Sequence, residues 1–394
     1  MRFSFYMPSN ILFGAGSLDE LGKVALPGKK ALIVISAGKS MREQGYLARV
    51  EALLHKNGVE SVVFDRIQPN PVKVHVMEGA KLAQEQGCDF VIGLGGGSSI
   101  DSAKSIALMA KNPGDYWDYI FGGSGLGKPV EHGALPIVAI TTTAGTGTEA
   151  DPWTVITKEE THEKIGFGNK YTFPVLSIVD PDLMTSIPPV LTAYQGFDAL
   201  FHAVEGYIAN CATPMSDLFA LKSIALIARW LPVAVREGEN REARAHMALA
   251  NTLSGFVEST SSCTSEHSLE HAMSARHAGL AHGAGLIMLS HAYYSFFQNR
   301  IPQHLYENMA RAMGEDVDAL PREERAGAFI TALDKLVEAC GMSHLRMPDF
   351  GITSEELPDL AKNARETMGG LFELDRYKLS FDETVEILQN AFSN

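Results

Sequence analysis

Histidines are concentrated in one short stretch of the second half of the chain, and their spacing is typical of a metal site. Four of the 13 histidines, His267, His271, His277 and His282, fall between positions 267 and 282. His267 and His271 are four residues apart, so both side chains would lie on one face of a helix. Core or surface histidines rarely gather so closely, and half of a metal site would explain the cluster. The spacing alone does not show which of the four bind.

A carboxylate and a further histidine form a second candidate half-site earlier in the chain. Asp198 and His202 are four apart, in a stretch that contains Phe197, Leu200 and Phe201. The pair could hold a divalent ion, although the same spacing also occurs in solvated pairs. The apolar neighbours favour the metal site, because an unpartnered carboxylate is costly in apolar surroundings. Mixed carboxylate and imidazole ligands suit iron(II) or zinc, and a histidine outside the ligand set could carry protons near neutral pH.

Two polar loops in the first half of the chain are candidates for binding a phosphate-containing ligand. The apolar run 90–94 leads into the sequence GGGSS at positions 95–99, after which the pattern is helical. Glycines let the backbone approach a ligand closely, and the N-terminus of a helix favours an anion. The alternative is a plain glycine turn, and the triple glycine favours anion binding over it. The second loop, TTAGTGTE at positions 142–149, is equally compatible with an ordinary threonine-rich turn.

The elements that must position these residues fall into two parts with different hydrophobic patterns. In the first part, short apolar runs alternate with helical patterns over 40–57 and 72–86, which predicts a mostly parallel sheet covered by helices. The expected strands are 31–35, 61–64, 90–94, 136–141 and 175–179. From about Ile187 the strand patterns cease, and the expected helices include 192–210, 215–235, 242–260 and 265–278. With a boundary at Pro188-Pro189, we predict an α/β nucleotide-binding domain at 1–187, an all-α domain at 188–394 and a ligand site in the cleft between them.

Composition narrows the classes of partner. The chain has 394 residues, of which 45% are hydrophobic and 20% charged, and its net charge of -14 makes nucleic acid and anionic membrane poor partners. No apolar run of transmembrane length and no secretory signal stands out, so no membrane association is expected. The four cysteines have no paired spacing, which favours free thiols in a reducing cytoplasm. We therefore expect a cytoplasmic protein.

Several separate motifs, in the right order, resemble the iron-type (group III) metal-dependent alcohol dehydrogenases. The resemblance covers nearly the whole chain, and it implies an N-terminal Rossmann-like domain, a helical metal domain and a cofactor lying between them. The residues that carry it are Asn70-Pro71, Gly95-Gly96-Gly97-Ser98 with Asp101 and Lys104, Thr142-Thr143-Ala144-Gly145-Thr146-Gly147, Asp180-Pro181, Asp198 with His202, and His267 with His271 and His282-Gly283.

The resemblance also implies roles for individual residues. His271 would assist proton transfer near the nicotinamide, and Asp101 is assigned both to the catalytic residues and to the cofactor contacts. The metal, Fe(2+) with Zn(2+) as an alternative, would be held by Asp198, His202, His267 and His282. The remaining cofactor contacts would be Asn70, Gly96, Gly97, Ser98, Thr142, Thr143, Thr146, Lys164 and Leu183.

Three positions depart from the family pattern. Ser36 follows the strand 31–35, where many NAD-specific members carry an aspartate that binds the adenosine ribose. The missing aspartate removes a charge that would repel a 2′-phosphate, and Lys39 with Ser40 could bind one. NADP(H) is therefore slightly preferred over NAD(H). The spacing from His271 to His282 is one residue longer than usual, which leaves His277 as a rival fourth ligand. Trp153 either narrows the substrate pocket or belongs to the core.

The predicted function is hydride transfer between NAD(P)H and a small alcohol or aldehyde, with the metal acting as a Lewis acid on the substrate oxygen. A glycerol- or hydroxyacid-type dehydrogenase of the same architecture is one alternative. A non-catalytic metal- or nucleotide-binding protein is another, from a different class. Members of the family commonly form dimers or larger assemblies, so a homo-oligomer is expected. The natural substrate is not specified by these motifs.

Overall fold

The computed structural model describes residues 2–393, and the chain divides into two compact units. One comprises Met7–Thr185, and the other comprises the chain from Ser186 onward together with the residues up to Tyr6. The N-terminal segment groups with the second unit because its aromatic side chains pack there, with the ring of Phe5 lying 6.3 Å from that of Phe219. Each unit has its own architecture and is described separately.

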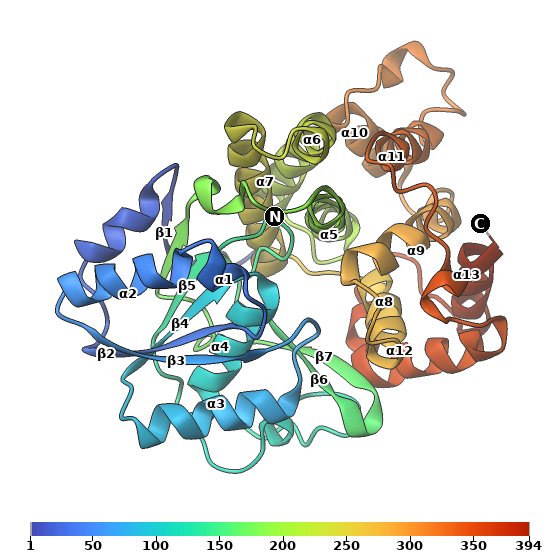
Figure 1. Cartoon of the computed structure of the whole chain (residues 1–394). Coiled ribbons are helices and arrows are strands. Elements are labelled where there is room, and N and C mark those ends of the chain that lie inside the picture. Colours follow the sequence, from blue (N-terminus) through green and yellow to red (C-terminus); the bar gives the residue numbers. More distant parts are fainter. Residues whose placement is uncertain (1, 394) are drawn as a thin grey trace. The chain divides into compact units, whose positions relative to one another are not determined.

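The first unit is built on a six-stranded, fully parallel sheet with the strand order β1-β8-β5-β4-β2-β3 (Figure 1). Its strands are β1 (Asn10–Phe13), β2 (Lys30–Ser36), β3 (Glu60–Ile67), β4 (Phe90–Gly95), β5 (Ile137–Thr141) and β8 (Leu176–Val179). A separate antiparallel hairpin is formed by β6 (Thr154–Lys158) and β7 (Glu163–Phe167). The central strands are buried on both faces, as expected for a parallel sheet covered by helices.

Helices cover both faces of this sheet. On one face, the 3-10 helix η1 (Ser17–Gly22) and α2 (Tyr46–Lys56) pack into a single apolar cluster with the strands. The other helices of the unit are α1 (Ser40–Glu43), α3 (Lys73–Glu85) and α4 (Gly97–Met109). The helices α3 and α4 contact each other closely at Gly79, where a Cβ atom would lie 2.4 Å from the side chain of Ile106. A larger residue there would require the Ile106 side chain or the helices to shift.

The predicted fold class is confirmed. All five expected strands of the α/β domain form, each within a few residues of its expected bounds, and they are parallel. Three strands were not predicted: β1, β6 and β7. The helix expected over 40–57 is broken into α1 and α2 at Gly45, whose φ of 73° is in the left-handed region that glycine tolerates.

The described residues of the second unit form helices and connecting segments, with no strand among them. Its helices are α5 (Pro189–Ile208), α6 (Pro214–Arg236), α7 (Arg241–Thr260), α8 (Ser265–Arg276), α9 (His282–Phe297), α10 (Gln303–Ala312), α11 (Gly327–Ala339), α12 (Leu357–Phe372) and α13 (Phe381–Ser393). By length and composition alone, α6 could cross a membrane, with a mean hydropathy of 1.7. It packs along α5 and α7, as a core helix of a folded domain does.

Candidate active site

The predicted cofactor residues of the first unit lie at the carboxyl ends of its parallel strands. In the strand order, β3 lies on one side of β2, while β4, β5 and β8 lie on the other, so the direction of winding reverses between β2 and β4. Ligands of open α/β sheets bind outside the carboxyl ends of the strands at such a reversal. The sequence places Ser36 and Lys39 at the end of β2, and the GGGSS loop at the end of β4.

The glycine loop and the threonine loop are packed directly against each other. A Cβ atom on Gly96 would lie 2.9 Å from the side chain of Thr143, and one on Gly97 would lie 2.4 Å from that of Thr146. Only glycine therefore allows this contact. The helix α4 begins at Gly97 without a capping side chain and has no acidic residue in its first turn. Its N-terminus keeps the positive end of the helix dipole available for a phosphate.

Asp101 is buried beneath these loops rather than presented at the surface. Its Oδ1 accepts a hydrogen bond from Thr148 Oγ1 at 2.7 Å, and its Oδ2 accepts one from the backbone N–H of Val155 at 2.9 Å. Burial raises the pKa of Asp101 to about 6, although Lys104 and these two hydrogen bonds lower it. Both carboxylate oxygens thus connect α4 to the threonine loop and to β6. The catalytic role predicted for Asp101 stays a prediction.

Three more predicted cofactor residues lie in different parts of the first unit. Asn70 has a left-handed backbone with a φ of 51°, and its Oδ1 accepts a hydrogen bond from Lys164 Nζ at 3.1 Å. Lys164 is buried in β7. Leu183 is buried in the 3-10 helix η4 (Pro181–Met184), which follows β8. Asn70 and Lys164 are therefore brought together from positions far apart in the sequence.

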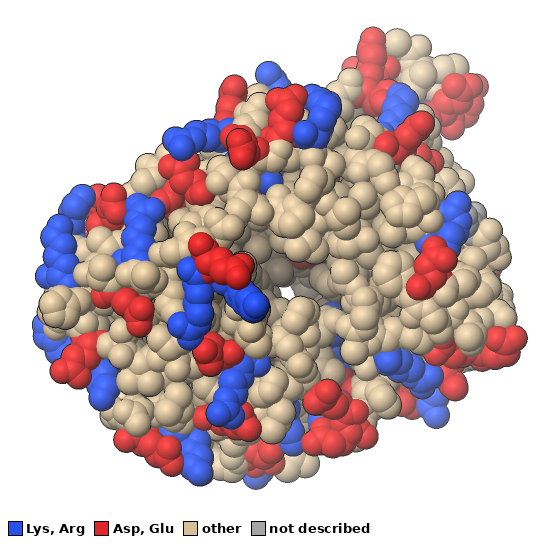
Figure 2. All heavy atoms as spheres, viewed as in Figure 1, with Lys and Arg blue, Asp and Glu red and all other residues tan. Residues whose placement is uncertain are grey.

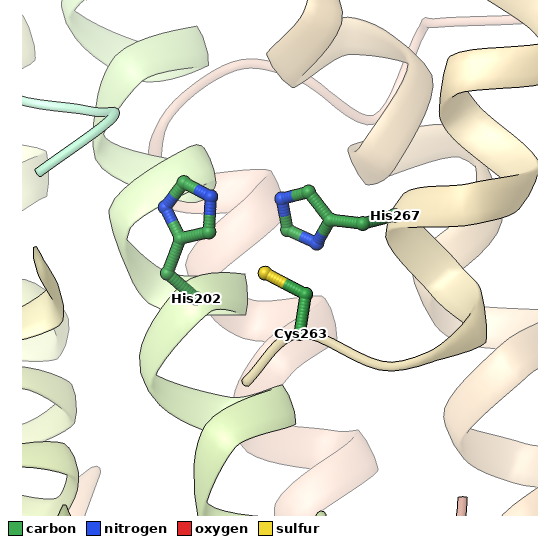
Figure 3. Close-up of side chains that lie close together, drawn as sticks. All are labelled: His202, Cys263 and His267. Atoms are coloured by element: carbon green, nitrogen blue, oxygen red, sulfur yellow. The ribbon is translucent and has the colours of Figure 1, made fainter. Parts of the chain in front are cut away.

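Four predicted metal ligands converge in the helical unit. Asp198 and His202 lie on α5, His267 lies on α8 and His282 is the first residue of α9. The Oδ1 atom of Asp198 lies 3.6 Å from Nε2 of His202, 3.7 Å from Nε2 of His267 and 3.4 Å from Nε2 of His282. The rings of His202 and His267 are stacked, with centroids 4.5 Å apart (Figure 3).

The three separations from Asp198 Oδ1 fit a single divalent ion. For metal–ligand bonds of roughly 2.0–2.2 Å, the ligand atoms of a tetrahedral site lie about 3.3–3.6 Å apart, close to the distances observed here. Asp198 Oδ1 and His267 Nε2 are buried and form no hydrogen bond. Buried polar atoms are almost always paired, because leaving one unpaired costs about 1–3 kcal/mol and more for a charged group. A cation at the centre would satisfy both atoms.

A buried glutamate supports His267 on the side of the ring away from Asp198. The Nδ1 atom of His267 contacts Glu205 Oε1, and Glu205 is fully buried on α5. The other oxygen of Glu205 accepts hydrogen bonds from the backbone N–H and the hydroxyl of Thr264, at 2.7 Å and 2.9 Å. A carboxylate on Nδ1 fixes the ring orientation and favours the tautomer that leaves Nε2 as the metal-binding atom.

The other two imidazoles have carboxylates at the same position. His282 Nδ1 contacts Glu270 Oε2, and His202 Nδ1 lies 3.5 Å from Glu258 Oε1. His267 and His282 therefore show the carboxylate–histidine arrangement that accompanies metal ligation, and a carboxylate also lies near Nδ1 of His202. The sequence analysis did not identify these glutamates. The signal that could have revealed them is a carboxylate among the apolar residues of a predicted helix.

The structure separates the two rival histidines of the second half-site. His282 joins the cluster, whereas His277 follows the last residue of α8 and its Nε2 lies 3.1 Å from Glu356 Oε1. The glycine after His282 explains its position. A Cβ atom on Gly283 would lie 2.1 Å from the carbonyl oxygen of Tyr194, so only glycine lets the start of α9 approach α5 this closely.

The electrostatics of the cluster favour the ligand forms of Asp198 and His202. Burial alone would raise the pKa of Asp198, but His202 and His282 lower it, and the net pKa lies well below the ordinary value. Burial lowers the pKa of His202 to about 4, which leaves its imidazole neutral at pH 7. A carboxylate and a neutral imidazole are the forms that bind a metal. At His267 burial lowers the pKa, but Cys263, Glu205 and Asp198 together raise it well above its ordinary value, so a bound ion would have to displace a proton from that ring.

His271 is placed beside the ligands without belonging to the set around Asp198. Its ring centroid lies 5.3 Å from that of His282 and 6.2 Å from that of His267. Its Nδ1 atom lies 2.8 Å from the sulfur of Met368 in α12. The side chain is almost completely buried in the helical unit.

Comparison with known proteins identifies the family of this chain. Residues 8–181 match the model for iron-containing alcohol dehydrogenase, and residues 192–392 match the C-terminal model of the Fe-containing alcohol dehydrogenase family. The chain belongs to the iron-containing alcohol dehydrogenase family. The resemblance inferred from the sequence motifs is thereby confirmed.

Characterised relatives match along most of the chain. It is 34% identical over 395 residues to a 1,3-propanediol dehydrogenase of Citrobacter freundii, covering 99% of each. It is also 34% identical to an NAD-dependent methanol dehydrogenase of Bacillus methanolicus, covering 92% of this chain and 93% of the relative. A solved archaeal alcohol dehydrogenase from a Red Sea brine pool superposes with a TM-score of 0.93 at 33% identity, covering 99% of this chain and 100% of the other. The protein is an oxidoreductase that transfers hydride between a nicotinamide cofactor and an alcohol or aldehyde.

Proposed function

We propose that this enzyme reduces small aldehydes and oxidises the corresponding alcohols with a divalent iron held by Asp198, His202, His267 and His282. The observation that carries the proposal is the convergence of three imidazole Nε2 atoms on one unpaired, buried carboxylate oxygen. Mixed oxygen and nitrogen ligands suit iron(II), and zinc is the alternative ion. Bound there, the ion would supply Lewis-acid polarisation of the substrate oxygen.

The side chains around the ligands have separate tasks in this reaction. Glu205 and Glu270 orient His267 and His282 through Nδ1, and Glu258 lies 3.5 Å from Nδ1 of His202. The imidazole of His271 is assigned to carry the proton that the alcohol loses when it is oxidised, because a histidine outside the ligand set lies directly beside the ligands. In the first unit, the N-terminus of α4 holds the cofactor phosphates.

A panel of substrates tests this proposal. Iron-loaded enzyme is incubated with NADPH and short aldehydes, diols and hydroxyaldehydes, and consumption of the reduced cofactor is followed by its absorbance. We expect turnover with short primary aldehydes and a return to activity when iron(II) is added to chelated enzyme. Absence of turnover across the panel with verified iron occupancy would contradict the proposal and favour a protein that only binds the metal and the nucleotide.

Glu205→Gln is expected to weaken metal binding without removing a ligand. The amide can no longer accept a full charge-assisted hydrogen bond from His267 Nδ1, so the affinity for iron(II) should fall about 10- to 100-fold. Competition with a chromophoric chelator measures the loss. Glu373→Gln, which alters an exposed ion pair with Lys378, is the control and should bind normally. Unchanged affinity in Glu205→Gln would show that the buried glutamate does not support the ligand.

We propose NADP(H) as the preferred cofactor, although the relatives named above include an NAD-dependent enzyme. Ser36 is half-buried and Lys39 is exposed at the end of β2, beside the point where the winding of the sheet reverses. A carboxylate at this place accepts hydrogen bonds from the adenosine ribose and repels a 2′-phosphate. Serine with a nearby lysine removes the repulsion and adds a positive charge.

Ser36→Asp should reverse this preference. The new carboxylate would repel the 2′-phosphate, so the ratio of kcat/KM for NADPH to that for NADH should fall by about 10- to 100-fold, or about 1.4–2.8 kcal/mol. Lys39→Ala should lower kcat/KM for NADPH alone. Lys29→Ala removes an exposed lysine from the opposite end of β2 and should leave the ratio unchanged. A ratio that does not move in Ser36→Asp refutes the assignment of this position.

Cytoplasmic location, a homo-oligomer and small-molecule partners complete the proposal. On the face shown in Figure 2, Lys and Arg side chains are interspersed with Asp and Glu. The net charge of -14 adds a long-range repulsion of polyanions, which argues against nucleic acid and anionic membrane as partners. Light scattering at two protein concentrations would test the oligomer.

A further inference from the structure

One cysteine lies against the predicted metal ligands but has no part in the set of Asp198 and three histidines. Cys263 belongs to the short connection between α7 and α8. One ligand atom each from His202, Cys263 and His267 lies within 4.8 Å of the other two. Figure 3 shows the thiol beside the two rings, with His202 coming from α5 and His267 from α8. The sequence analysis treated this cysteine only as a free thiol.

The backbone around Cys263 is anchored to the same glutamate that orients His267. Thr264, the next residue, donates from its N–H and its hydroxyl to Glu205 Oε2, while Glu205 Oε1 contacts His267 Nδ1. Cys263 and His267 therefore share one buried support. The thiol is held near the imidazole by this network rather than by the chance position of a loop.

The unpaired nitrogen of the Asp198 cluster also belongs to a side chain of the triad His202, Cys263 and His267. His267 is 4% exposed, and its Nε2 atom is buried and forms no hydrogen bond. In a tetrahedral zinc site, with zinc–sulfur bonds of about 2.3 Å and zinc–nitrogen bonds of about 2.1 Å, sulfur and nitrogen lie about 3.6 Å apart. The three donors lie within 4.8 Å of one another, so side-chain movements of about 1 Å would bring them to that distance.

We propose that Cys263 gives this centre a second mode of metal binding, in which a thiophilic divalent ion is held by the Cys263 thiolate with His202 and His267. Soft thiolate donors favour ions such as Zn²⁺ and Cd²⁺, whereas the carboxylate of Asp198 favours harder ions. As the metal–sulfur bond forms, the thiol releases its proton to solvent and no electrons are transferred. The proposal rests on the proposed metal centre, because two ligands are shared.

Cobalt(II) reports directly on thiolate ligation. Metal-free enzyme is titrated with Co²⁺, and a thiolate-to-cobalt charge-transfer band in the near ultraviolet is recorded together with the visible bands of the bound ion. We expect the charge-transfer band in the unmodified enzyme and in Cys211→Ser, a matched control that removes an exposed cysteine. Both Cys263→Ser and Cys263→Ala should lose the band, and their affinity for Cd²⁺ should fall about 10-fold or more.

One further variant separates this proposal from the proposed iron centre. In Asp198→Ala, the three donors of the thiolate mode remain, so the charge-transfer band should persist. If the unmodified enzyme binds Co²⁺ with visible bands but no charge-transfer band, the thiolate mode is wrong and the iron centre stands. If the band appears and survives in Cys263→Ser, the sulfur donor is a different residue and the proposal is overturned. If no Co²⁺ binds at all, both proposals fail together.

Discussion

Asp198→Ala is expected to lower turnover at least about 10³-fold, or about 4 kcal/mol of transition-state stabilisation, because Lewis-acid polarisation of the substrate supplies several kcal/mol. Asp198 supplies a carboxylate oxygen that lies 3.4–3.7 Å from the Nε2 atoms of His202, His267 and His282. Without it, iron(II) loses its charged ligand and three neutral or cationic rings remain close together. Bound iron, measured by atomic absorption after dialysis, should fall in parallel with turnover.

Cofactor binding distinguishes loss of the metal from loss of the fold. The residues proposed to bind NADPH belong to the unit Met7–Thr185, whereas Asp198 lies on α5 of the helical unit. Quenching of NADPH fluorescence should therefore give a nearly unchanged Kd in Asp198→Ala. Asp334→Ala, which removes an exposed carboxylate paired with His291, should retain iron and activity. Full iron occupancy in Asp198→Ala, or loss of NADPH binding together with the fold, would count against the assignment.

The sheet was predictable because its central strands carry the strongest local signal. The strands β2, β4 and β5 are almost entirely apolar, since both faces of a parallel sheet are covered. The edge strand β1 has only four residues and is partly exposed, so it lacks both alternation and a long apolar run. Its partner β8 lies far along the chain. Pairing across such a distance leaves no local pattern to detect.

The metal cluster was predictable in part for a similar reason. Spacing of four residues places Asp198 with His202 on one helix face, but it does not show which histidine of the second stretch approaches α5. That choice depends on Gly283, where the absence of a side chain lets α9 contact the backbone of Tyr194. Glu205 and Cys263 acquire their positions from packing between α5, α7 and α8, and contacts of that kind have no fixed sequence spacing.

The buried lysine of α4 marks a second place where one substitution should have a large effect. Lys104 is fully buried, and its Nζ donates to Thr148 Oγ1 at 2.6 Å, to the carbonyl oxygen of Trp153 at 2.7 Å and to Asp151. The contacts with Asp151 are 2.9 Å to its carbonyl oxygen and 3.1 Å to its Oδ1. The ammonium group thus ties α4 to the end of the threonine loop. Asp151 is itself 1% exposed.

Lys104→Met is expected to destabilise the unit Met7–Thr185 by about 3–5 kcal/mol, because it leaves the Asp151 carboxylate buried without its cation. Urea unfolding followed by tryptophan fluorescence measures the change, since Trp117 and Trp153 belong to this unit. Lys111→Met, at an exposed position just after α4, is the control and should shift stability by less than about 0.5 kcal/mol. If Lys104→Met lowers the free energy of unfolding by no more than the control does, the ion pair between Lys104 and Asp151 contributes little.

Two further measurements test the mechanism of that loss. Adding Asp151→Asn to Lys104→Met removes the stranded charge, so the double variant should recover much of the stability. Burial already raises the pKa of Asp151 while Lys104 lowers it, and without Lys104 the folded-state pKa must rise further. The folded form of the single variant then binds more protons than its unfolded form, so its stability falls as the pH rises through this window. The deficit relative to the unmodified enzyme should therefore be smaller at about pH 5 than at about pH 8, and a deficit independent of pH would point to lost packing instead of a stranded carboxylate.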